Sequence, residues 1–229
     1  LKAAYSGGDS DPTATVTAMP TAVVPTEVII GTDTTATGTS TAGPINQFYR
    51  SRHGQSVYTA AELNAGGIFG PINITQVGFN IAGLPAQTMP NYVVRMGHTT
   101  AANVANWIST GLTQVWNSAS YLPVATGWNL YTLTTPFLWN GIDNIVIDTA
   151  FGMIASYQAS GTTLYTTVTS GYRYNQSDSA DQTSVFTGGS TSTNRPNVKF
   201  VFQPNADGPT IAVSPSSLAY GEVAVGGSS

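Results

Sequence analysis

The sequence predicts an all-β protein: a jelly-roll-like β-sandwich of antiparallel sheets with extended terminal strands. The first observation is that alternating runs recur between turn signals about every 8 to 12 residues, a spacing typical of sandwiches. The second is that helix signals are nearly absent. The third is the block 127–148, in which two alternating apolar runs flank a turn. With 229 residues and 41% hydrophobic content, the chain can bury a core.

The block 127–148 predicts two adjacent core strands joined through a Pro-containing corner and an Asn140–Gly141 turn. In its first run Trp128 points to one face and Tyr131 to the other, so both faces are apolar. Because a strand with one wet face would not need this, we expect it to lie centrally in a layered β structure. Trp128 and Trp139 are accordingly expected in the core.

The remaining elements follow from local patterns. The only helix candidate is 59–63, where Thr59 can cap the first turn and the Gly66–Gly67 pair can end it. Strands are expected wherever apolar, β-branched and aromatic residues alternate with polar ones. The expected strands are 72–82, 92–97, 114–119, 128–134, 144–150, 163–169, 183–186 and 198–203.

Composition restricts the function classes. Charged residues make up 8% of the chain, against about 25% in typical soluble domains, and Thr, Ser, Asn and Gly take their place. Such a surface of hydroxyls and amides is typical of extracellular modules. The net charge is −4 and the basic residues are scattered, which excludes a nucleic-acid groove and a polybasic membrane patch. There is no cysteine and no apolar run near the roughly 20 residues of a membrane helix. We read the chain as a mature or trimmed secreted protein.

Three regions are expected: an extended Thr/Pro-rich segment (1–27), the sandwich (28–205) and a C-terminal strand segment (206–229). Both end segments contain alternating runs without a local partner, 13–18 and 211–225. Since unpaired strand backbone needs a partner, we expect at least one of them to pair with a sheet edge of another copy. The candidate donor-strand residues are Ala14, Val16, Ala18, Ile211, Val213, Leu218 and Tyr220.

His53 and His98 are the only imidazoles. The sequence places His53 in a loop and His98 at the end of a strand. A Ser-His-Asp triad would need one of them beside Ser51 or Ser56 and Asp143. No G-x-S-x-G elbow or comparable context supports such a triad. We therefore expect no catalytic residues and no enzymatic activity.

Carboxylates offer two further readings. Asp143 and Asp148 are the closest pair in the sheet region, but their odd spacing turns them to opposite faces of a strand, against a glycosidase pair. Turn chemistry explains Asp143 better. Calcium would need several loop oxygens, for which Asp178 and Asp181 are the candidate ligands. The default reading is a solvated loop with no metal or other cofactor.

Aromatic and arginine side chains carry the two remaining expectations. Trp107, Trp116 and Tyr121 lie in a stretch between strands and are the candidate glycan platform. The arginines make up a large share of the few charges, and we expect them to hold loops through backbone carbonyls and carboxylates such as Glu62. These arginines are Arg50, Arg52, Arg95, Arg173 and Arg195.

Three blocks carry a family resemblance: 49–63, 128–148 and 195–200. Together they resemble a jelly-roll-like module of secreted, surface-anchored proteins of Bacteroidetes-type bacteria, akin to cleaved-adhesin domains, over about residues 31–204. The tail from 211 resembles the opening of the Ig-like repeats that follow such modules. The resemblance implies an extracellular or cell-surface location, with adhesion or glycan binding as associations, and it implies no catalytic residues.

The sequence thus predicts a non-catalytic extracellular structural or adhesive protein that self-assembles into a filament by strand addition through its ends. The alternative is a carbohydrate-binding module of a larger secreted protein. The expected partners are further copies of the chain or glycans, and neither nucleic acid nor a membrane interior.

Overall fold

The computed structural model describes residues 4–5, 8–9 and 26–204. Residues 4–5 and 8–9 form two short strands, β1 (Ala4–Tyr5) and β2 (Gly8–Asp9), which pair with each other in antiparallel orientation. All the candidate donor-strand residues, at 14–18 and 211–220, lie outside the described residues. Their proposed pairing stays a prediction.

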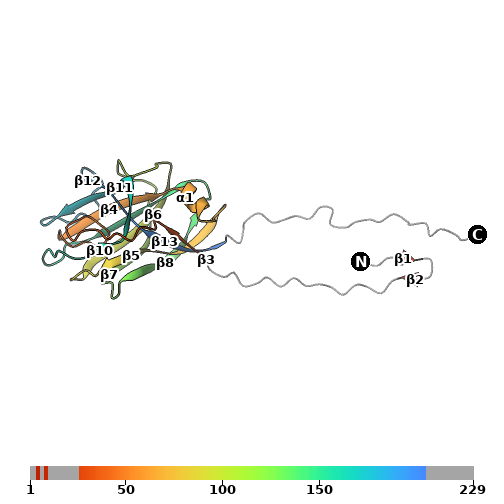
Figure 1. The fold of residues 1–229 in the computed structure, drawn as a ribbon, viewed down its shortest axis with the longest axis horizontal. Coiled ribbons are helices and arrows are strands. Elements are labelled where there is room, and N and C mark those ends of the chain that lie inside the picture. The colour runs from red at the N-terminus through yellow and green to blue at the C-terminus, as the bar shows by residue number, and fades with distance from the viewer. Residues whose placement is uncertain (1–3, 6–7, 10–25, 205–229) are drawn as a thin grey trace, which may run out of the picture.

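Residues 26–204 form two antiparallel sheets stacked as a β-sandwich, as predicted (Figure 1). The five-stranded sheet has the order β10-β5-β13-β3, with β8 also paired to β5. Its strands are β3 (Thr26–Ile30), β5 (Ile72–Gly83), β8 (Gly127–Trp139), β10 (Thr162–Thr163) and β13 (Val198–Pro204). The six-stranded sheet has the order β12-β11-β4-β9-β6-β7. Its strands are β4 (Ser51–Tyr58), β6 (Met89–Thr99), β7 (Thr113–Tyr121), β9 (Asn144–Phe151), β11 (Tyr165–Ser177) and β12 (Ser190–Pro196).

The main core lies between the sheets. Alternate residues of β5 and β13, such as Ile74 and Phe200, face alternate residues of β6 and β9, such as Met96 and Phe151, and all four are buried. Trp139 is also fully buried, and its indole Nε1 donates a hydrogen bond to the carbonyl of Asp143. The core placement of Trp139 is therefore confirmed.

The helix prediction is confirmed. α1 (Ala60–Ala65) begins with a capping box, in which the Thr59 hydroxyl accepts from the backbone of Glu62 while the Glu62 carboxylate accepts from the backbone of Thr59. Gly66 ends the helix. Leu63 is the one buried helix residue, and it packs into the main core.

Several strand predictions need correction. The range 183–186 contains a turn at 183–184 and no strand, and 163–169 spans the short β10 and the start of β11. The strands β3, β4 and β12 were not predicted. The missing β4 matters most, because it lies in the middle of the six-stranded sheet and carries His53, which sequence reasoning had placed in a loop.

The block 127–148 was also misread in part. Its two strands, β8 and β9, lie in different sheets, and β8 pairs only with β5 among the described residues, so it is an edge strand. Leu130 is 37% exposed on its outward face. Trp128 is only half-buried, under the ammonium of Lys199 at 5.3 Å, and it does not belong to the core. The outward face of a sandwich sheet meets solvent, and the apolar residues on that face of β8 misled the prediction.

Candidate functional site

A row of polar side chains crosses three neighbouring strands on one face of the six-stranded sheet. In the antiparallel register Gln55 of β4 lies opposite Asp148 of β9, and Asp148 lies opposite Arg95 of β6. Ile147, next to Asp148, packs in the main core, so Asp148 points to the face turned away from the other sheet. His53 lies two residues before Gln55 and therefore shares this face.

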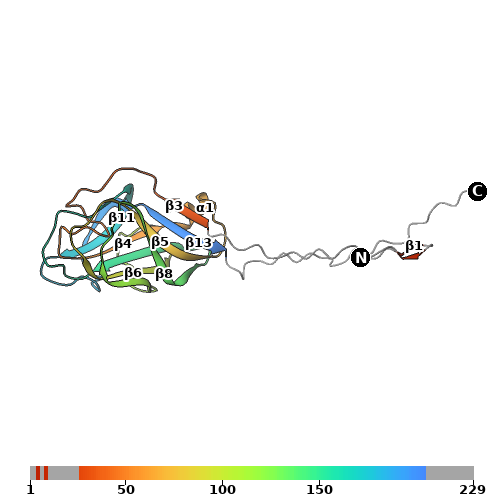
Figure 2. The same cartoon turned by 90° about the horizontal axis from the view of Figure 1, so that it is seen from below.

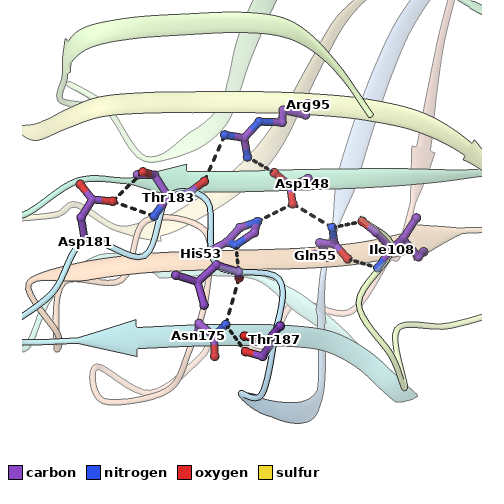
Figure 3. Close-up of polar contacts among 10 residues, drawn as sticks. His53, Gln55, Arg95, Ile108, Asp148, Asn175, Asp181, Thr183 and Thr187 are labelled. Atoms are coloured by element: carbon purple, nitrogen blue, oxygen red, sulfur yellow. Dashed lines mark hydrogen bonds and ion pairs between the residues drawn. The ribbon is translucent and has the colours of Figure 1, made fainter. Parts of the chain in front are cut away.

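Asp148 is the centre of the site (Figure 3). Its Oδ2 contacts His53 Nε2 at 2.5 Å and accepts from Gln55 Nε2 at 2.8 Å, and its Oδ1 accepts from Arg95 at 2.6 Å. His53, Gln55 and Asp148 are fully buried, whereas the Arg95 side chain is 21% exposed. A buried carboxylate is costly unless it is paired and hydrogen-bonded, and here both oxygens have charged or amide partners.

His53 has no ring nitrogen free for proton transfer. Its Nδ1 lies 2.9 Å from the carbonyl oxygen of Val185, which can only accept, so Nδ1 carries a hydrogen. Its Nε2 is engaged by Asp148. The imidazole also stacks on Trp107 at 4.6 Å and meets the edge of Phe186 at 4.6 Å. Neither nitrogen bonds to a hydroxyl within the described part of the chain.

The serines and the aspartate considered for a triad do not bond to His53. The Ser51 hydroxyl donates to the carbonyl of Phe151 and accepts from the backbone of Gln182. Ser56 lies on the opposite face of β4 from His53, by strand alternation. The carboxylate of Asp143 accepts from the side-chain amide of Asn140 in the turn before β9. The structure therefore assembles a His-Asp pair without a nucleophile, and with Asp148 in place of Asp143.

The same network fixes two loops, 100–112 and 178–189, on this face. Gln55 exchanges two hydrogen bonds with the backbone of Ile108, and Arg95 donates to the carbonyl of Thr183. Asn175 of β11 donates to the carbonyls of Val185 and Thr187. Figure 3 shows these contacts converging from the sheet onto the two loops.

A polar groove of about 280 Å³ opens beside Arg95. It lies between the outer faces of β6 and β7 and the loop at Thr183. The exposed amides of Gln114 and Asn117 contribute to its wall, together with Ser118. Because Arg95 is held by a buried carboxylate and a carbonyl, its position at the groove is preorganised. The groove can offer amide and guanidinium hydrogen bonds to a hydroxyl-rich ligand.

The predicted glycan platform is not brought together. Trp116 and Tyr121 contact each other at 5.4 Å between ring centroids, and both pack against the main core beside Tyr92. Trp107 lies on the other face of the sheet, where it contacts His53 and the guanidinium of Arg173. Its indole Nε1 donates to the carbonyl of Gly188. Trp116 and Tyr121 therefore pack together at the main core, while Trp107 lies apart from them on the opposite face.

The calcium candidates serve local loop structure. Asp178 accepts from the backbone of Arg50, and Asp181 accepts from the backbone and hydroxyl of Thr183. Within the ranges that the structure describes, no three His, Cys, Asp or Glu side chains gather as a metal site.

The structural reading of the arginines is confirmed, because each of the five donates to at least one backbone carbonyl. Arg195 also pairs with Glu62 at 2.5 Å and joins β12 to α1. Burial acts to raise the pKa of Glu62, but hydrogen bonds from Arg195 and Thr59 outweigh it and hold that pKa below its usual value. Arg52 lies between the sheets, where burial lowers its pKa and its partner is Asn46.

Sequence reasoning dismissed Asp148 because it was compared only with Asp143. One signal could have found it: Asp148 is the only charge in the otherwise uncharged run of β9. An ionised group in a core strand needs a partner, and arginine and histidine at alternating positions of nearby strands are the natural candidates.

Comparison with protein-family models, with curated proteins and with solved structures found no match to this chain. Among the described residues, no helix combines the length and the hydropathy needed to cross a membrane.

Proposed function

We propose that this chain is a non-catalytic extracellular module of a bacterial surface protein, structural or adhesive, which assembles with copies of itself by strand addition. The observation that carries the proposal is the free edge of β12. Within residues 26–204, β12 pairs only with β11, and its sequence up to Asn194 contains hydroxyl and amide side chains alone. Edge strands are usually protected by charges or proline, and this part of β12 has neither.

The other edges are better protected. β8 contains Pro136, which cannot donate a hydrogen bond to an added strand. β3 is five residues long, carries Glu27 and lies against α1. β7 lies beside β8, and the hydroxyl of Thr134 donates to the carbonyl of Val115. β12 is therefore the preferred acceptor.

The preferred donor is the alternating run 13–18, which places threonines on one side and small apolar side chains on the other. Paired with the Ser and Thr side chains of β12, such a strand would form cross-strand hydroxyl contacts worth roughly 0.2 to 1 kcal/mol each. A donor at one chain end and an acceptor edge elsewhere make a head-to-tail contact, which propagates as a filament unless the rotation closes a ring.

Two features support a non-catalytic role. The ring nitrogens of His53 are both engaged, and Asp148 is buried under the two loops, away from solvent. General acid–base catalysis requires a group within reach of a substrate proton, which neither side chain meets in this arrangement.

Assembly can be tested by charging the β12 edge. The double substitution Thr191→Lys with Thr193→Lys should leave the monomer fold unchanged and abolish assembly measured by light scattering and sedimentation velocity. Removal of residues 1–25 should have the same effect. The matched control is Thr100→Lys with Thr126→Lys, which adds the same charge on exposed loop threonines and should assemble like the parent. Normal assembly of the β12 variant would refute the proposal.

The Arg95 groove favours a second candidate, a carbohydrate-binding module. Planar amides and a fixed guanidinium can each form paired hydrogen bonds with adjacent sugar hydroxyls. A glycan array followed by calorimetry tests it, with Asn117→Ala as the groove variant and the loop substitution Asn106→Ala as the control. Equal affinity of the two variants for any bound glycan would exclude the groove.

A further inference from the structure

Both described ends of the 26–204 domain lie at one end of the sandwich. β13 finishes with Pro204 opposite Ile72, and β3 begins with Thr26 opposite Phe202. Trp139, at the end of β8, is also opposite Ile72. Figures 1 and 2 show β3 and β13 reaching this same end.

Large apolar side chains are exposed at this end. Phe69 is 77% exposed, Ile142 79% and Leu138 48%. The loops of Phe69 and Ile142 touch, because a Cβ added at Gly141 would lie 2.7 Å from the backbone of Gly70. We call Phe69, Leu138 and Ile142 the end patch. Several large apolar side chains exposed in one region mark an interaction site more often than an isolated exposed residue does.

The tip of the 140–143 turn is held rigidly. The side-chain oxygen of Asn140 accepts from the backbones of Ile142 and Asp143, and the Asn140 amide donates to the carboxylate of Asp143 at 2.7 Å. The carbonyl of Asp143 is in turn fixed by the buried Trp139 indole. The turn therefore presents an isoleucine to solvent in a fixed position, where turns usually carry polar residues.

We propose that the end patch binds the segment of this chain that follows Pro204, residues 205–229, through Ile211 and Val213. Gln203 and Leu138 both lie opposite Asn73, one on each side of β5. They are thus separated by two strand spacings, about 10 Å. The seven residues from Pro204 to Ile211 can span up to about 25 Å, so the apolar pair reaches the patch.

Tethering favours this occupant over a second copy. A segment attached within about 10 Å of its binding surface acts at an effective concentration on the order of millimolar. The patch residues are uncharged, and the spacing of Ile211 and Val213 would place both side chains on one face of the segment if it binds in an extended conformation. The contact is separate from the β12 edge at Ser190–Pro196, so either proposal can fail without the other.

The absence of cysteine allows a clean cross-linking test in the full chain. Cysteines are introduced as Ile142→Cys with Val213→Cys, a position on the strand face that would meet the patch, which retains Phe69, Leu138 and Ile211. The control is Val124→Cys with Val213→Cys. Val124 is 88% exposed and precedes Gly127, which lies opposite Ile81 at the other end of β5.

The first pair should form an intramolecular disulfide at least about tenfold faster than the control pair, as expected for a tethered contact. Adding Phe69→Ser should slow it toward the control rate. Equal rates for the two pairs would overturn the proposal. A covalent dimer as the main product of the first pair would also overturn it, because a second copy would then occupy the patch. Melting curves of each reduced variant show whether it is folded.

Discussion

Asp148→Asn should destabilise the protein strongly. The substitution removes the negative charge that faces Arg95 and His53. It also replaces one carboxylate oxygen by an NH₂ group, so at least one hydrogen-bond donor loses its acceptor. Gln55 loses its charge-assisted bond at 2.8 Å as well. Breaking a buried ion pair by changing one partner costs about 3 to 5 kcal/mol. Because Arg95 is 21% exposed and can regain water, we expect the lower half of that range, about 3 to 4 kcal/mol.

The assay is urea denaturation followed by tryptophan fluorescence, with amide hydrogen exchange at Ile108 as a local probe. The backbone of Ile108 donates to Gln55, which Asp148 orients, so its protection should fall in the variant. A loss of this size corresponds to roughly 6 to 16 °C in Tm for a domain of this length. Asp143→Asn is the control, since it removes the same charge from a half-buried turn, and should cost about 0.5 kcal/mol. If the two variants unfold at the same urea concentration, the reasoning about the network is wrong.

Three further predictions concern the fold. Trp139→Ala should cost about 3 to 5 kcal/mol, whereas Trp128→Ala, at the half-buried position, should cost about 1 kcal/mol; matched denaturation curves check the contrast. Glu62 has a lowered pKa in the fold, so its contribution to stability is complete above its ordinary value of 4.5 and is lost as pH falls below it. Stability measured from pH 7 to pH 3 should therefore show a smaller acid loss for Glu62→Gln than for the parent. Gly78→Ala should weaken β5–β8 pairing by about 1 to 3 kcal/mol, because its Cβ would overlap the carbonyl of Asn129; protection of β8 amides unchanged from the parent would contradict this.

Local signals predicted much of the fold. The α1 cap depends on Thr59 and Glu62, three residues apart, and needs no tertiary information. Strands such as β5 and β9 have an inward face against the core, so their alternation or apolar content is visible in the sequence. The arginines were also interpreted correctly, because a cation kept in a charge-poor chain needs carbonyl or carboxylate partners.

The missed strand β4 shows why the site was not predicted. All eight of its residues are buried, although five of them are Ser, Arg, His, Gln and Ser. His53 and Gln55 are polar and buried because loops cover their face, and the carboxylate that both of them contact, Asp148 of β9, is 93 to 95 residues away in sequence. Alternation shows which face meets the core, but it cannot show which loop covers the other face.

Anchoring by arginine explains how a chain without cysteine fixes so many loops. Arg50 donates to the carbonyls of Ile154 and Asp178, and Arg173 donates to those of Ala105 and Gly188. In each case one planar guanidinium joins two segments that are distant in sequence. A lysine ammonium could not replace it, because it lacks the forked arrangement of donors. Disulfides would do this by covalent constraint, and small secreted domains commonly use them. Here the surface is otherwise almost uncharged, so few carboxylates compete for these guanidinium groups and their hydrogen bonds stay with backbone carbonyls. The low charge content therefore favours the hydrogen bonds between arginines and backbone carbonyls that hold the loops in place.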